Sequence, residues 1–150
     1  MAADTGKHAA TAALLLACGA SLAASQGMLV GGKYEPAPGE GVICHMGIYN
    51  MLAEYGRRCS PPPKPEFQAE LERSIVRIDE YVLANSKISR DQIAAFKLKQ
   101  SRVGAPDASI CRADFGEMYQ SASKASATEL RDSVDKLLAR PGEPTWGDCL

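Results

Sequence analysis

The sequence predicts an all-α protein, a small bundle of four to five short helices stapled by two disulfides. After residue 41, apolar residues recur at helical spacing in every long segment, and Pro or Gly separates these segments. No strand-like alternation and no internal repeat interrupts this pattern. The chain has 150 residues, of which 45% are hydrophobic, so it is long enough for one domain with a real core.

The first 25 residues have the pattern of an export signal peptide. Lys7 precedes an alanine-rich apolar run at 9–18, and small residues follow up to residue 25. A second interpretation is open, because Leu15-Leu16-Ala17-Cys18 resembles the lipobox of bacterial lipoproteins, in which the cysteine is lipidated. A third is a cytosolic chain with reduced thiols. We expect residues 26–41, rich in Gly and Pro, to form a flexible arm before a single helical domain at 42–150.

The cysteines favour two disulfides in an oxidising compartment. Either form of export removes Cys18 from the count and leaves four. A continuous helix over 42–58 would hold Cys44 and Cys59 about 22 Å apart, too far for a bridge, which needs Cα atoms within about 7 Å. Antiparallel packing of successive helices favours Cys59–Cys111. The remaining pair is then Cys44–Cys149; a break at Gly47 would reopen the 44–59 pairing.

Two helices are predicted in the first half of the domain. The first, at 42–58, is expected at the centre of the bundle, with Glu54 and Arg58 paired on its outer side. The second, at 64–85, carries a regular apolar stripe. Its members are Phe67, Leu71, Ile75, Ile78 and Val82.

Capping boxes predict where two later helices begin. Ser89 with Gln92 begins one, and Ser126 with Glu129 begins another. Between them, a fourth helix is expected from Asp107 or Ser109 to about residue 122. Its inward face would carry Cys111, Phe115, Met118 and Ala122. The last helix is expected to bury Leu130, Val134, Leu137 and Leu138 and to pair Arg131 with Asp135 on its surface.

The sequence carries no catalytic or metal-binding signature. It has no GxSxG elbow, P-loop, GxGxxG or CxxC motif and no clustered metal ligands, so we expect no enzymatic activity, cofactor or metal. His45 is the one candidate ligand residue, with Tyr49 one turn away, although a packed histidine is the plainer interpretation. Glu66 and Glu70, also one turn apart, are interpreted as solvated surface rather than an acid–base pair.

Two features are candidates for contact with a partner. Trp146, the only tryptophan, lies in a tail that the Cys44–Cys149 bridge would hold, so it is either an aromatic anchor for a partner or a cover for the end of the bundle. Residues 87–102 are basic, and Lys97, Lys99 and Arg102 are the candidate contacts for an acidic protein or a lipid headgroup. A solvated basic face is the alternative. The net charge of −1 and the lack of interleaved aromatics argue against nucleic acid.

These observations predict a periplasmic or secreted protein of the bacterial envelope that acts as a non-catalytic binding module. Its expected partner is another envelope protein or an anionic surface. Two alternatives stay open. One is an envelope enzyme or small-ligand carrier with a site assembled by the fold near His45. The other is a lipid-anchored structural protein that contacts the membrane only through a lipid at Cys18.

Overall fold

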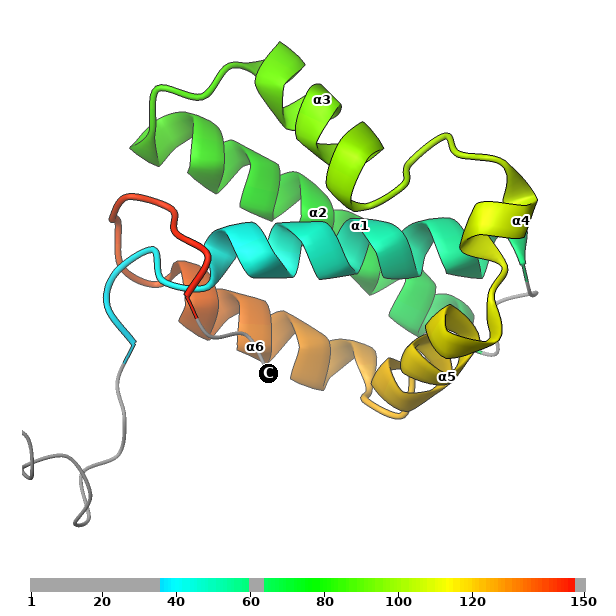
Figure 1. Ribbon diagram of the computed structural model, residues 1–150. Helices are drawn as coiled ribbons and strands as arrows, with labels where there is room; N and C mark the ends of the chain where they lie inside the picture. Colours follow the sequence, from blue (N-terminus) through cyan, green and yellow to red (C-terminus); the bar gives the residue numbers. More distant parts are fainter. Residues whose placement is uncertain (1–35, 60–63, 148–150) are drawn as a thin grey trace, which may run out of the picture. The chain divides into compact units, whose positions relative to one another are not determined.

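A computed structural model describes residues 36–59 and 64–147, which are helical with no strands (Figure 1). The helices of these residues are α1 (Val42–Arg58), α2 (Pro65–Asn85), α3 (Arg90–Gln100), α4 (Asp107–Ile110), α5 (Ala113–Ala122) and α6 (Ala127–Leu138). The predicted all-α class is therefore confirmed. The compact helical unit begins at Pro36, so the last six residues of the predicted arm belong to it. The leader-like segment and Cys18 lie outside the described residues.

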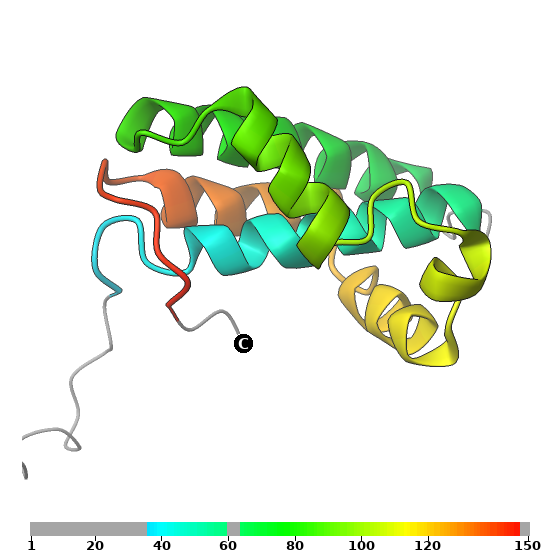
Figure 2. The same cartoon turned by 45° about the horizontal axis from the view of Figure 1, so that its top comes forward.

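Helix α1 is the centre of the arrangement, and α2, α3, α4 and α5 all contact it (Figures 1 and 2). Two clusters of buried side chains follow it from end to end. Around its N-terminal half the cluster includes Val42, Met46, Ile78, Val82 and Ile93. Around its C-terminal half it includes Leu52, Phe67, Leu71, Tyr119 and Val134. The core is thus built mainly where α2 and α6 pack near the central helix.

The apolar stripe predicted for α2 is confirmed. Its members are all buried, and Leu71 and Ile78 have no exposed surface at all. Pro65 begins the helix, where its missing N–H group would have had no helical partner. Helical periodicity was sufficient here because α2 lies between α1 and α6 and buries one continuous face.

Both predicted capping boxes are present. The Ser89 hydroxyl accepts from the backbone N–H of Gln92, and the Gln92 side chain accepts from the backbone of Ser89. Ser126 and Glu129 form the same reciprocal pair at the start of α6. These local hydrogen bonds satisfy N–H groups that a helix start leaves unpaired, and they need no tertiary contact.

The predicted fourth helix is wrong in one respect, because the chain breaks into α4 and α5. Arg112, between them, is extended, with φ −88° and ψ 153°. The break turns α5 out of phase with α4, so the one face expected to carry Cys111 and Met118 does not exist. Met118 is 42% exposed, whereas its neighbour Tyr119 is buried. The described residues therefore hold six helices instead of the four or five expected.

One complete disulfide lies within the described residues, and it is the predicted Cys59–Cys111 bridge. The two Cα atoms are 5.2 Å apart. It joins the end of α1 to the break between α4 and α5, so it closes a loop that contains α2, α3 and α4. Cys44 is also disulfide-bonded, but its predicted partner, Cys149, lies outside the described residues.

Candidate functional site

The C-terminal tail is held against the beginning of α1 by backbone hydrogen bonds. The N–H of Thr145 donates to the carbonyl of Gly39 at 3.0 Å, and the N–H of Ile43 donates to the carbonyl of Thr145 at 3.1 Å. The Tyr81 hydroxyl donates to the carbonyl of Arg140 at 2.8 Å. These hydrogen bonds fix the backbone of the tail at Thr145 against the start of α1. The side chain of the next residue, Trp146, is therefore attached to a backbone of defined position.

Trp146 contacts Phe96 of α3, and both rings are near the surface. Their centroids are 5.7 Å apart, a usual separation for aromatic pairs, and their planes are tilted by 49°. Phe96 lies above Gly47 of α1, where a Cβ would be 3.7 Å from the Phe96 ring, in ordinary contact. Trp146 nevertheless stays 55% exposed. Figure 2 shows α3 and the tail beside the same half of α1.

We call this region the tail–α3 surface, and we define it by Trp146, Phe96, Leu98, Lys99 and Arg102. Leu98 is 63% exposed on the last turns of α3. Lys99 is exposed, and Arg102 follows the helix end in the left-handed conformation, with φ 55°. The surface therefore combines an aromatic pair, one large aliphatic side chain and two exposed cations.

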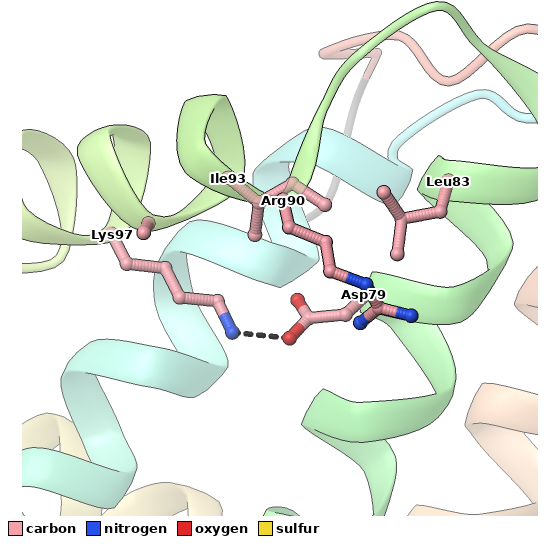
Figure 3. A pocket seen from close by; sticks show the side chains of 6 residues that line it. Asp79, Leu83, Arg90, Ile93 and Lys97 are labelled. Atoms are coloured by element: carbon pink, nitrogen blue, oxygen red, sulfur yellow. Dashed lines mark hydrogen bonds and ion pairs between the residues drawn. The ribbon is translucent and has the colours of Figure 1, made fainter.

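Lys97, predicted to belong with the other cations, points elsewhere. Its ammonium group pairs with Asp79 of α2 (Figure 3), and the two side chains are only 17% and 23% exposed. They line a pocket of about 180 Å³ between α2 and α3, together with Arg90 and Ile93. The other Asp79 oxygen, Oδ1, is buried and has no hydrogen-bond partner. Lys97 thus attaches α3 to the bundle, and it leaves Lys99 and Arg102 as the outward cations.

His45 lies on α1 with its imidazole Nδ1 2.9 Å from the carbonyl oxygen of Gly41. A carbonyl oxygen only accepts hydrogen bonds, so Nδ1 carries the proton and Nε2 of the neutral ring is left as an acceptor. The ring also contacts Tyr49 edge-on, with centroids 5.5 Å apart. Neither contact supplies a carboxylate that would orient the imidazole as a general base.

Tyr49 lines an apolar cavity of about 220 Å³ at the junction of α1, α2 and α6. Phe67, Leu71 and Leu130 form much of its wall, and Glu129 lies at the same cavity. Burial raises the pKa of Tyr49, so its phenol stays neutral at physiological pH. The sequence placed His45 and Tyr49 together, and the structure confirms their contact.

Two buried carboxylates are features that the sequence analysis missed. Glu54, expected on the outer side of α1, is 7% exposed and receives hydrogen bonds from both Arg57 and Arg58. Burial alone would raise the pKa of Glu54, but these two arginines and the N–H of Gly104 lower it overall. Arg58 also pairs with Asp107 beside the disulfide. The carboxylate therefore connects α1 to the segment before α4.

Glu70, interpreted as solvated surface, is 2% exposed. Its Oε2 accepts from Arg131 of α6 at 2.9 Å and from Arg73 at 2.7 Å. The hydrogen bond from Arg131 lowers the pKa of Glu70, burial opposes this, and Arg73 lowers it further. The pairing predicted between Arg131 and Asp135 is wrong, because Arg131 turns to α2. The contact between Arg131 and Glu70 forms because α6 packs beside α2, and no spacing in the sequence indicates that packing.

Neither a metal centre nor a membrane span is found where the chain is described. Between residues 36 and 59 and between 64 and 147, no three His, Cys, Asp or Glu side chains gather closely enough to hold a metal ion. None of the helices in these ranges has the length and hydropathy needed to cross a bilayer.

Comparison with protein-family models gave no match, and comparisons with curated proteins and with solved structures gave no significant match. The function must therefore be inferred from the geometry of the candidate sites.

Proposed function

We propose that this protein is an exported, non-catalytic binding module whose contact surface is the tail–α3 surface. The observation that carries the proposal is the exposure of Trp146. Trp146 is 55% exposed, although the backbone just before it is hydrogen-bonded to the start of α1 and its ring contacts Phe96. A pre-positioned indole loses little conformational entropy on binding, and tryptophan is enriched among residues that dominate binding energy.

The polar groups that could do chemistry support a non-catalytic function. Glu54 and Glu70 are each paired with two arginines, which favours the ionised form and leaves neither poised to exchange a proton. His45 donates to a backbone carbonyl and contacts a tyrosine, without a carboxylate or a nucleophile among these contacts. These side chains are better suited to stabilising helices than to acid–base work.

Export is supported by the leader-like first 25 residues together with the Cys59–Cys111 bridge. Structural disulfides persist mainly in oxidising compartments such as the periplasm. We include in this proposal the second bridge, Cys44–Cys149. Cys44 is disulfide-bonded, and Gly147 lies so close to α1 that a Cβ on it would be 3.1 Å from Cα of Gly41. Two further residues span about 7 Å when extended, which is enough chain for the proposed bridge to close.

The processing of the N-terminus decides between a soluble and an anchored protein. Cleavage by the end of residue 25 gives a free periplasmic or secreted domain, whereas a lipid on Cys18 would give an anchored structural protein. Mass spectrometry of the mature N-terminus in the native host distinguishes them, because acylation adds a large, characteristic mass to a peptide that begins at Cys18.

A small-ligand carrier is a second candidate, favoured by the cavity beside Tyr49. Its apolar lining and its volume of about 220 Å³ suit a small, largely apolar molecule. Thermal unfolding in the presence of indole or a similar small aromatic molecule tests this candidate. A rise in Tm that Leu130→Trp abolishes, by filling the cavity, would support it, and an unchanged Tm would argue against it.

Capture from envelope extract tests the main proposal. The immobilised full chain is incubated with a detergent-solubilised envelope extract of the native host, and retained components are compared between variants. Trp146→Ala should lose a component that the wild type retains. Met118→Ala, which removes another exposed apolar side chain from α5, should keep it. Equal capture by the wild type and Trp146→Ala would contradict the assigned surface.

A further inference from the structure

We propose that the tail–α3 surface binds a bilayer that contains anionic lipid, with Trp146 and Leu98 entering the interface and Lys99 and Arg102 against the headgroups. This inference rests on the proposed function, since it names the partner of the same surface.

The side chains of α3 divide between a packed side and an exposed side. Successive residues of an α-helix are rotated by about 100°. On this basis Lys99 lies about 60° from Phe96, and Leu98 lies about 160° away in the same sense. The buried Ile93 lies about 60° from Phe96 in the opposite sense. Ile93 therefore packs on the bundle, Phe96 lies next to it in contact with Trp146, and the remaining side of α3 carries Lys99 and Leu98 into solvent.

Helix α3 is only lightly buried. Ile93 is its only buried residue, and the Lys97–Asp79 pair provides a polar attachment. Ala94, Ala95 and Leu98 are exposed. Because α3 is so lightly buried, the exposed Leu98 and the neighbouring Trp146 are free to enter a headgroup region while Lys99 stays in water.

Charged side chains are distributed unevenly along α3. The exposed cations of this region are Lys87, Arg90, Lys99 and Arg102. Asp91, in the first turn of α3, and Glu143, which shares a pocket with Lys87, lie toward the N-terminal end of α3. Asp107 follows Arg102 in the chain but pairs with Arg58, and Glu40, beside Gly147, accepts from the backbone N–H of Ala37. The end of α3 that carries Lys99 and Arg102 therefore keeps an excess of positive charge. Anionic headgroups complement this excess.

The geometry favours a lipid surface over an acidic protein. Trp146 and Leu98 are exposed rather than recessed, and the pocket between α2 and α3 is lined by other residues, among them the Lys97–Asp79 pair. Projecting side chains suit a soft interface, into which they insert without a matching cavity. A protein partner would have to supply complementary pockets of its own.

The single tryptophan provides a direct test, because all indole fluorescence of the chain comes from Trp146. The full chain is mixed with protein-free vesicles of phosphatidylcholine alone or of phosphatidylcholine with an equal amount of phosphatidylglycerol. With the anionic vesicles we expect a shift of the emission to shorter wavelength and weaker quenching by acrylamide. Raising the salt to about 0.5 M should reverse both changes, because salt screens headgroup attraction. Neutral vesicles should change neither.

Matched variants separate this surface from other membrane contacts, including any made by the first 35 residues. Lys99→Glu keeps the fluorophore and should weaken partitioning at least fivefold, whereas Lys136→Glu, an exposed lysine of α6, should have little effect. Leu98→Ser should also weaken it, and Met118→Ser should not.

An unchanged Trp146 spectrum with anionic vesicles would overturn the inference, as would a response that Lys99→Glu and Leu98→Ser leave intact. Neither result would change the outcome of the capture experiment, which tests for a protein partner independently. If Trp146-dependent capture persists while the vesicles fail, the binding module stands and the lipid partner is wrong. If both fail, the tail–α3 surface is not a binding surface.

Discussion

Gly56 of α1 lies directly against the ring of Tyr119 of α5. A Cβ added to Gly56 would be 2.8 Å from Cε2 of this ring, closer than real side chains approach, and it would also meet the Gln68 side chain. The Tyr119 hydroxyl donates to Oε1 of Gln68 at 3.1 Å, and Gln68 Nε2 donates to the carbonyl of Ala53 at 3.3 Å. The missing side chain of Gly56 thus permits a buried polar contact that joins α1, α2 and α5.

Alanine at the two helical glycines of α1 should therefore have opposite effects. Gly47→Ala should stabilise the fold by about 0.5–1 kcal/mol, because its Cβ meets Phe96 at ordinary contact distance and alanine favours the helix. Gly56→Ala should destabilise it by about 1–3 kcal/mol, because the added methyl overpacks Tyr119. Urea unfolding of both variants measures this difference. If both were stabilised, the close packing of Tyr119 on α1 would be wrong.

Truncation of Leu71 should be costly, because its side chain has no exposed surface and lies at the centre of the cluster around the C-terminal half of α1. Leu71→Ala should lower the free energy of unfolding by about 2–5 kcal/mol through lost burial and the cavity left behind. Val76 of the same helix is 55% exposed, so Val76→Ala is the control and should cost less than about 0.5 kcal/mol. Similar costs for the two variants would mean that the register of α2 is wrong.

Acid should weaken the contact between α2 and α6. The pKa of Glu70 is lowered in the folded state, chiefly by the hydrogen bond from Arg131. Its stabilising contribution is therefore complete above the ordinary pKa of a glutamate and is lost as pH falls through the lowered value. We expect the free energy of unfolding to decrease between about pH 5 and pH 3.

Unfolding of the Glu70→Gln variant by urea at several pH values tests whether Glu70 causes this acid dependence. At pH 7 it should cost about 1–3 kcal/mol, because the arginines lose a charged acceptor, and the dependence of stability on acid should become shallower. Glu66→Gln, an exposed position one turn earlier, should leave the acid dependence as it is. A Glu70→Gln variant with the full acid dependence of the wild type would show that other carboxylates, such as Glu54, cause it.

Both disulfides are expected in the exported protein. Non-reducing peptide mapping of the exported protein should recover Cys59 linked to Cys111 and Cys44 linked to Cys149. The residues of the first pair are separated by 52 positions; loop-closure entropy for a loop of that size corresponds to about 4 kcal/mol. The double variant Cys59→Ser with Cys111→Ser should therefore lose up to this amount in urea unfolding. Recovery of free Cys44 or free Cys111 would contradict the predicted pairing.

Much of the fold follows from local pattern. The stripe of α2 and the capping boxes of Ser89 and Ser126 depend on contacts within one helix or one turn, so spacing alone predicts them. The Cys59–Cys111 bridge followed from helix length and antiparallel order. The contact between His45 and Tyr49 was accessible for the same reason, since residues four apart share a helix face.

The sequence by itself determined that this chain forms helices and where most of them begin, because hydrogen bonds and periodicity within each helix set these features. The lengths of those helices also indicated that Cys59 pairs with Cys111. Only the tertiary structure decided that Glu54 and Glu70 are buried, that Lys97 turns inward to Asp79, and that Trp146 lies exposed on Phe96. A charged side chain can face water or a partner at the same position in a helix. Which of these it meets depends on the neighbouring helix, and distant parts of the chain supply that neighbour.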